Sequence, residues 1–154
     1  MSLEINSKIP DFSAPCTGLG EFSLAAHAGK NLVIYFYPKD STPGCTTEGE
    51  NFRDLHAEFL HSDCLIFGVS RDSLKSHENF KRKIELPFEL LADTEETLCQ
   101  MFGVMKMKNM YGKQVRGVER STFLFDVNGK LAKEWRGIKV TGHVDEVLKA
   151  AQAL

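Results

Sequence analysis

The chain has 154 residues, of which 42% are hydrophobic, and its formal net charge at pH 7 is −2. This length and apolar content fit a single globular domain over residues 1–154 and leave little room for a second one. The nearly balanced charge argues against nucleic acid as the main partner, because nucleic-acid binding normally requires a basic face.

The N-terminal stretch MSLEINSKIPDF has no apolar core of the kind found in a signal peptide, and the longest apolar run, LVIYFY, is far too short to span a bilayer. We therefore expect a cytoplasmic protein without a membrane partner. The chain has four widely spaced cysteines and no secretion signal, so a disulfide framework is not expected. These cysteines are Cys16, Cys45, Cys64 and Cys99.

Three short apolar runs predict buried strands. They are rich in Val, Ile and Phe and do not alternate with polar residues, which is typical of central strands covered on both faces. The runs lie at 32–37, 64–69 and 122–125. After the last one, Asn128-Gly129 in DVNGK predicts a tight turn into LAKEW and hence an antiparallel hairpin.

Two segments show the apolar periodicity of a helix. Apolar residues after Cys45 recur at i, i+3, i+7 and i+8, and the C-terminal segment shows a similar stripe. The first stripe consists of Phe52, Leu55, Phe59 and Leu60, and the second of Val144, Val147, Leu148 and Ala151. A weaker helix is predicted at 73–84 and a short one at 96–102.

The predicted order is strand, helix, strand, helix, short helix, hairpin, helix. It corresponds to a βαβ half followed by a ββα half, and it favours an α/β thioredoxin-like fold with a mixed sheet and helices on both faces. The basic segment 105–116, MKMKNMYGKQVR, is predicted to be a solvated loop. The alternative is a rim that recruits an anion or a partner protein.

The segment around Cys45 has the features of a reactive thiol. Thr42 suits a helix N-cap and Pro43 the first helical position, which places Cys45 at the third. Unpaired backbone N–H groups and the helix dipole there favour thiolate over thiol, although Cys45 could also be a small packed residue. Glu48, one turn further, would repel a thiolate unless a cation stood between them, so we expect a cation from a distant segment.

The stretch FYPKDSTPGCTTE resembles the active-site segment of the peroxiredoxins, whose pattern is Pro-x-x-x-Thr/Ser-x-x-Cys. The wider sequence resembles the subfamily called bacterioferritin comigratory protein or peroxiredoxin Q. The matching stretches are KIPDFSAP, GVSRDSLKSHENF, MYGK and ERSTFLFDVNGK, so the resemblance covers nearly the whole chain.

This resemblance implies a thioredoxin-fold peroxidase that reduces hydrogen peroxide and organic hydroperoxides. Cys45 would attack the peroxide and become a sulfenic acid. Thr42 would hold thiolate and peroxide, and Pro38 would shield the sulfur from solvent. Arg120 would supply the distant cation, and Glu48 would orient it.

In this subfamily a second cysteine commonly reacts with the sulfenic acid to form a disulfide, and this chain has no cysteine at either of its usual positions. The two usual positions correspond here to Glu50 and Lys81. We therefore hypothesise a one-cysteine mechanism in which an external thiol, such as thioredoxin, glutaredoxin or a small thiol, reduces Cys45.

A two-cysteine mechanism with another cysteine of the chain is the alternative. Cys64 begins an apolar strand and is predicted to be inert core. Cys99 is predicted to be half-buried on a short helix, and Cys16 to lie in a flexible loop at 15–20. None is placed near Cys45 by the sequence.

Other functions fit the residues less well. A redox sensor or holdase that does not turn over would use the same thiolate. A cysteine phosphatase requires Cys-x5-Arg, but Arg53 lies eight positions after Cys45. A thiol-disulfide oxidoreductase would require Cys-x-x-Cys, but position 48 is Glu. The histidines share no metal-ligand spacing, so we expect neither metal nor cofactor. The resemblance favours a monomer, with a dimer as the alternative.

Overall fold

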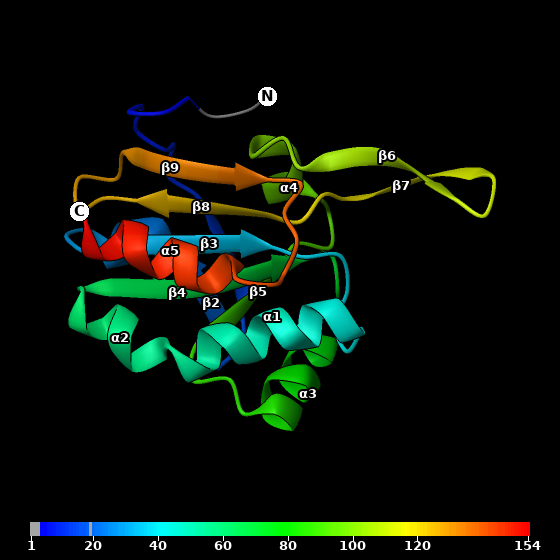
Figure 1. Ribbon diagram of the computed structural model, residues 1–154, viewed down its shortest axis with the longest axis horizontal. Coiled ribbons are helices and arrows are strands. Elements are labelled where there is room, and N and C mark those ends of the chain that lie inside the picture. The colour runs from blue at the N-terminus through cyan, green and yellow to red at the C-terminus, as the bar shows by residue number, and fades with distance from the viewer. Residues whose placement is uncertain (1–3, 19) are drawn as a thin grey trace.

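A seven-stranded mixed sheet forms the centre of the computed structural model, which describes residues 4–18 and 20–154 (Figure 1). The strand order is β2-β1-β5-β4-β3-β8-β9. The central strands β3, β4 and β5 are parallel, and the other pairings are antiparallel. The strand bounds are β1 Ser13–Cys16, β2 Gly20–Ser23, β3 Asn31–Phe36, β4 Cys64–Ser70, β5 Glu89–Ala92, β8 Ser121–Phe125 and β9 Leu131–Arg136. The predicted mixed sheet and the β8–β9 hairpin are confirmed.

Helices cover both faces of the sheet, as predicted. Residues of α1, α2, α3 and α5 share one buried apolar cluster, whereas α4 contributes to the cluster on the other face (Figure 1). The bounds are α1 Pro43–Asp54, α2 His56–His61, α3 Leu74–Ile84, α4 Thr97–Met101 and α5 His143–Gln152, with a 3-10 helix η1 at Leu24–His27. Among the residues that the structure describes, no helix is long and apolar enough to cross a membrane.

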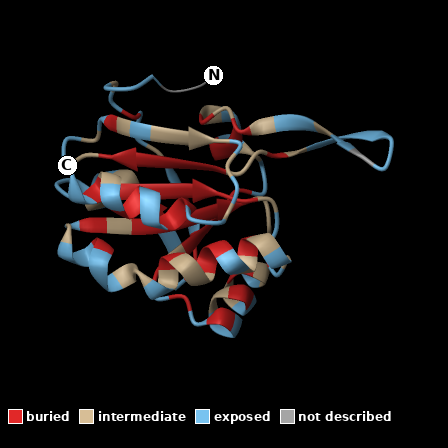
Figure 2. Cartoon of the chain, in the orientation of Figure 1, coloured by how far each residue is buried: buried red, intermediate tan, exposed pale blue. Residues whose placement is uncertain are grey.

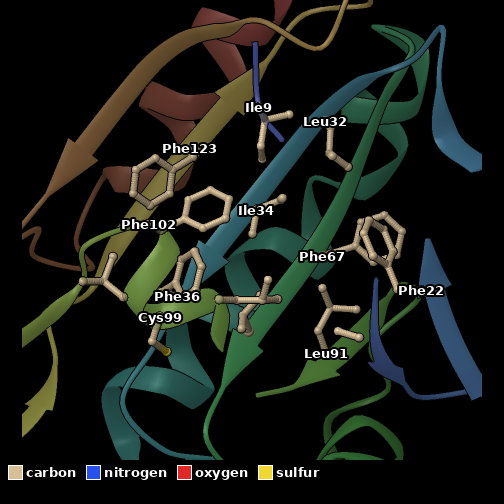
Figure 3. Close-up of a cluster of buried hydrophobic side chains, with 14 of the residues drawn as sticks. Ile9, Phe22, Leu32, Ile34, Phe36, Phe67, Leu91, Cys99, Phe102 and Phe123 are labelled. Atoms are coloured by element: carbon tan, nitrogen blue, oxygen red, sulfur yellow. The ribbon is translucent and has the colours of Figure 1, made fainter. Parts of the chain in front are cut away.

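Strand β3 shows why the core has two halves. Its side chains alternate between the faces, so Ile34 and Phe36 enter one cluster while Val33 and Tyr35 enter the other. Figure 2 shows the resulting buried strands at the centre of the molecule, and Figure 3 shows the cluster on the α4 face. A run without polar residues is therefore the expected sequence for this position.

The start of α1, which carries Cys45, lies at the edge of the sheet where the parallel strands end. Because β3, β4 and β5 run in the same direction, the segments that follow them meet at this edge. Helix α1 starts there, separated from the end of β3 by six residues, and runs back over the sheet (Figure 1).

The predicted helix after Cys45 is interrupted, which corrects one sequence-based expectation. Helix α1 ends at Asp54, Leu55 leaves helical geometry with φ −104° and ψ 7°, and α2 begins at His56. The break rotates α2 so that Phe59 remains fully buried while Leu60 is 47% exposed. Leu60 is thus not part of the buried stripe.

The basic segment 105–116 is not a loop, which corrects a second expectation. Strands β6 (Met105–Met110) and β7 (Lys113–Val118) pair in an antiparallel hairpin that projects from the body (Figure 1). Tyr111 and Gly112 connect them with φ of 53° and 80°, the left-handed conformation that a two-residue hairpin turn requires. The alternation of Met and Lys before Tyr111 was the signal for a strand.

Candidate active site

The start of α1 places Cys45 as predicted, at the third helical position after the N-cap residue Thr42 and Pro43. Thr42 has extended backbone geometry, and its carbonyl accepts the first helical hydrogen bond from Thr46 N at 2.9 Å. Its hydroxyl does not cap the helix but donates to Lys39 O at 2.8 Å. The helix therefore begins without a side-chain cap, and Cys45 itself is only 2% exposed.

Arg120 reaches Cys45 from just before strand β8. Its Nη2 atom lies 3.4 Å from Cys45 Sγ, and its Nη1 atom donates to Glu48 Oε1 at 2.6 Å. Gly44 allows this approach, because a Cβ atom at that position would lie only 3.1 Å from Nη2. The structure thus brings together Cys45, Glu48 and Arg120, which are separated by up to 75 positions in the sequence.

The charges of this group depend on one another. Burial raises the pKa of Glu48 from 4.5 to about 7, although Arg120 acts in the opposite direction. Burial alone would lower the pKa of Arg120, but the negative charges of Glu48 and Cys45 outweigh it and raise that pKa. Arg120 therefore remains cationic and can stabilise both a thiolate and negative charge that develops on a departing oxygen.

The cations closer to Cys45 in the sequence do not serve this purpose. Lys39 is exposed, and Arg53 donates to Ile84 O at 2.8 Å and to Asp54 Oδ1 at 3.0 Å near the other end of α1. Pro38 and Thr42 are both partly buried on the segment that joins β3 to α1. Both residues lie close to Cys45 in the sequence, and their roles stay predictions.

A buried network that the sequence did not reveal anchors the segment before α1. Asp40 accepts a hydrogen bond from Tyr37 Oη at 2.6 Å and lies 2.8 Å from His77 Nδ1 on α3. Nε2 of His77 carries a hydrogen, because it lies 2.8 Å from the carbonyl oxygen of Leu91, which can only accept. The only sequence signal for Asp40 was its place inside the motif stretch FYPKDSTPGCTTE.

Asp72 joins this network by accepting from Asp40 N at 2.9 Å. The potential ligand atoms of Asp40, Asp72 and His77 lie within 4.8 Å of one another. These atoms already form hydrogen bonds within the network, so we assign no metal to them.

The other three cysteines are buried, and two predictions about them need correction. Cys16 lies in strand β1 at 1% exposure rather than in a flexible loop, because it pairs with Gly20 and Leu91 in the sheet. Cys99 is fully buried rather than half-buried, since α4 packs against the sheet, and burial raises the pKa of its thiol. Cys64 begins β4 as predicted, and burial raises its pKa to about 12.

These positions also separate the three thiols from Cys45. Cys16 and Cys99 belong to the apolar cluster on the opposite face of the sheet. Cys64 pairs with Asn31 at the start of β3, whereas α1 begins beyond its end, about 16 Å away at the rise of a strand. A disulfide requires Cα atoms within about 7 Å.

The two positions at which the resemblance places a resolving cysteine hold charged residues. Glu50 lies on α1, with its Oε2 atom 4.0 Å from Arg53 Nη1. Lys81 on α3 donates to Glu89 Oε1 at 2.6 Å and so ties α3 to strand β5. Thr17 Oγ1 donates to the same carboxylate oxygen at 2.6 Å, which extends the tie to the segment after β1.

Comparisons with known proteins identify the family of this chain. Residues 5–134 match the model of the AhpC/TSA family. The peroxiredoxin Bcp of Xanthomonas campestris is 53% identical over 151 residues, which cover 98% of this chain and 94% of that protein. The peroxiredoxin Bcp of Bacillus subtilis is 49% identical over 149 residues, with 97% and 95% covered.

Solved structures give the same result. The bacterioferritin comigratory protein of Xanthomonas campestris has a TM-score of 0.90 and 51% identity, with 97% of this chain and 98% of that chain covered. Peroxiredoxin Q of Xylella fastidiosa has a TM-score of 0.94 and 38% identity, with 99% and 98% covered. Both the predicted thioredoxin-like fold and the predicted resemblance are confirmed. The chain therefore belongs to the AhpC/TSA family and is, within it, a thiol-dependent peroxidase of the peroxiredoxin Bcp, or peroxiredoxin Q, type.

Proposed function

We propose that Cys45 is the peroxidatic cysteine and that an external thiol, not another cysteine of the chain, reduces it after each reaction. The observation that supports the first part is the contact of Arg120 with both Cys45 and Glu48. The positions of the other three cysteines support the second part.

In the first step the thiolate of Cys45 attacks one oxygen of the peroxide. An S–O bond forms while the O–O bond breaks, and the departing oxygen takes up a proton and leaves as water or an alcohol. The guanidinium of Arg120 stabilises the charge on that oxygen, and Glu48 holds the guanidinium in place. We assign hydrogen peroxide and organic hydroperoxides as substrates; the Xanthomonas campestris relative is described for its alkyl peroxide reduction activity.

Thr42 and Pro38 complete the proposed site. The hydroxyl hydrogen of Thr42 is donated to Lys39 O, which leaves the oxygen lone pairs to accept a hydrogen bond from the peroxide. Pro38 would limit access of water to the sulfur.

In the second step an external thiol attacks the sulfenic acid. The new S–S bond replaces the S–O bond and water leaves, and a second thiol then releases Cys45 by disulfide exchange. Because Cys45 is 2% exposed, a protein thiol can reach it only after the first turn of α1 opens.

The experiment is disulfide mapping of the unmodified chain by mass spectrometry after one equivalent of hydrogen peroxide, with a sulfenic-acid trap in a parallel sample. We expect trapped sulfenic acid at Cys45 and no intramolecular disulfide. A bond from Cys45 to Cys16, Cys64 or Cys99 would establish the two-cysteine alternative instead.

A redox sensor or holdase would use the same site without turnover. Stoichiometric oxidation with no catalytic peroxide consumption, with thioredoxin, glutaredoxin and glutathione each supplied as reductant, would favour that function. The expected monomeric state, the cytoplasmic location and the single domain stay predictions.

A further inference from the structure

The β6–β7 hairpin stands beside the proposed active site. Strand β7 ends at Val118, and the chain then passes through Glu119 to Arg120. Figure 1 shows the hairpin extending beyond the end of the sheet at which α1 begins. The hairpin thus projects from the end of the molecule that carries the first turn of α1 and Cys45.

The two faces of the hairpin differ. Cross-strand pairing puts Lys106, Lys108 and Lys113 on one face together with Val115, which we call the lysine face. The opposite face carries Met105 and Val118, which pack into the body, and Arg116, whose guanidinium pairs with Glu96.

Lys108 on the lysine face lies near the active site. Lys108 Nζ donates to Val118 O at 2.6 Å, two residues before Arg120. The pKa of Lys108 is lowered by burial and by the charge of Arg120, and Cys45 acts in the opposite direction, so both groups are within electrostatic range of it.

Salt bridges and hydrogen bonds fix the hairpin at its base. Glu96, at the start of α4, accepts from Arg116 and also from Arg71 at 3.1 Å. Glu119 N donates to Val104 O at 2.7 Å across the base of the two strands. These contacts hold the base of the hairpin against the body, and the part near Tyr111 projects from this fixed base.

The exposed composition of the lysine face is that of an interaction surface. Residues 105–118 contain no acidic side chain, and three of their four cationic side chains, Lys106, Lys108 and Lys113, lie on this face, in a chain whose net charge is −2. Val115 is 42% exposed, and Tyr111 at the tip is fully exposed. Exposed tyrosine and clustered cationic residues next to apolar ones favour a partner with an acidic, partly apolar surface.

We propose that the lysine face docks the protein that reduces Cys45, and that this protein is an acidic dithiol reductant of the thioredoxin class. The proposal rests on the one-cysteine mechanism above. The docked protein would contribute one thiol to form the mixed disulfide with loss of water, and its second thiol would then release Cys45 and leave the reductant oxidised.

The test compares two substitutions that change the net charge equally. Lys113→Gln lies on the lysine face, and Gln114→Glu lies on the opposite face of the same strand, where both residues are exposed. Turnover of hydrogen peroxide is measured with an acidic bacterial thioredoxin, its reductase and NADPH, and in parallel with dithiothreitol.

We expect Lys113→Gln to raise the KM for thioredoxin about threefold, and the double variant Lys106→Gln with Lys113→Gln to raise it about tenfold. Gln114→Glu should leave this KM near the original value. Added salt should raise the KM of the unmodified protein but affect the double variant less. Turnover with dithiothreitol should be the same in all variants.

Equal KM values for the lysine-face and opposite-face variants would overturn the docking proposal. It would also fail if turnover with dithiothreitol fell in parallel, or if the unmodified protein accepted glutaredoxin but not thioredoxin. In each of these cases peroxide reduction through Cys45 would stand. Failure to consume peroxide with every reductant would instead overturn the proposed function itself.

Discussion

Glu48 illustrates how a single buried residue connects stability and chemistry. Its carboxylate is fully buried, and Oε1 is bonded to Arg120 while Oε2 has no hydrogen-bond partner among the described residues. Burial raises the pKa of Glu48 to about 7. Burial of the carboxylate that orients Arg120 thus lowers the free energy of unfolding near neutral pH.

We expect Glu48→Gln to change how stability depends on pH. Between pH 4.5 and about 7 the folded protein keeps the Glu48 proton that the unfolded chain loses, so stability falls as pH rises through this range. The full effect corresponds to about 3 kcal/mol, and Gln should remove it. Urea denaturation at several pH values would measure it, with Glu50→Gln on the same helix as control. An unchanged pH dependence in Glu48→Gln would contradict the expectation.

We also expect peroxide reduction to require the guanidinium group of Arg120 and not only its positive charge. One guanidinium nitrogen contacts Glu48 and the other contacts Cys45, a geometry that a single ammonium group does not reproduce. Arg120→Met should reduce kcat/KM for hydrogen peroxide about 100-fold, and Arg120→Lys should recover only part of it. Turnover with dithiothreitol at pH 7 is the measurement, and Arg116→Met is the control. Nearly full activity in Arg120→Met would refute the proposed role.

At the scale of elements, α1 joins the site to the core. Its first turn carries Cys45 against Arg120, while Phe52 further along is fully buried in the cluster that α1 shares with α3 and α5. Two glycines of α1 lie close to side chains of other segments, one near the site and one near the core. Gly44 faces Arg120 and Gly49 faces Ile84.

We expect alanine at these two glycines to have different effects. In Gly44→Ala the new Cβ would lie 3.1 Å from Arg120 Nη2 and displace it, so kcat/KM for hydrogen peroxide should fall roughly tenfold with little loss of stability. In Gly49→Ala the Cβ would lie 3.1 Å from Ile84 Cδ1, so stability should change and activity should not. Kinetics and thermal melts of both variants separate these outcomes. Equal activity in the two variants would show that Gly44 does not matter for Arg120.

For the whole molecule, the network around Asp40 links three elements that are distant in the sequence. It connects the segment before α1 to His77 on α3 and, through His77 Nε2, to Leu91 in β5. Lys81 ties the same helix to Glu89 of β5. These contacts hold α3 and the active-site segment against the sheet.

We expect His77→Ala to destabilise the fold by about 3 kcal/mol, because it removes a fully buried side chain and its hydrogen bonds to Asp40 and to Leu91 O, although Tyr37 and Ser76 still donate to Asp40. The exposed pair of Lys30 and Asp63 provides the control, since its N–O distance of 2.9 Å is similar. Lys30→Met should cost less than about 1 kcal/mol. Chemical denaturation of both variants tests this, and a similar cost for the two would show that the buried network contributes little.

Much of the fold and the site could be predicted from local patterns. The buried strands, the β8–β9 turn and the place of Cys45 at the start of α1 depend on neighbouring residues, and all appear as expected. The short strands β1, β2 and β5 were missed, because four residues carry too little periodicity to distinguish them from loops. The break at Leu55 was missed because the helical stripe continues through it.

The sequence by itself determined that Cys45 lies in the first turn of a helix that begins at Pro43, and its motif identified the family. It could not determine that Arg120 reaches Cys45 or that His77 reaches Asp40. These pairs are distant in the chain and are brought together by the parallel order of β3, β4 and β5 and by the pairing of β3 with β8. Nor could it show that Cys16, Cys64 and Cys99 lie away from Cys45. Those distances are properties of the sheet, since strand order and direction decide which distant side chains share an edge.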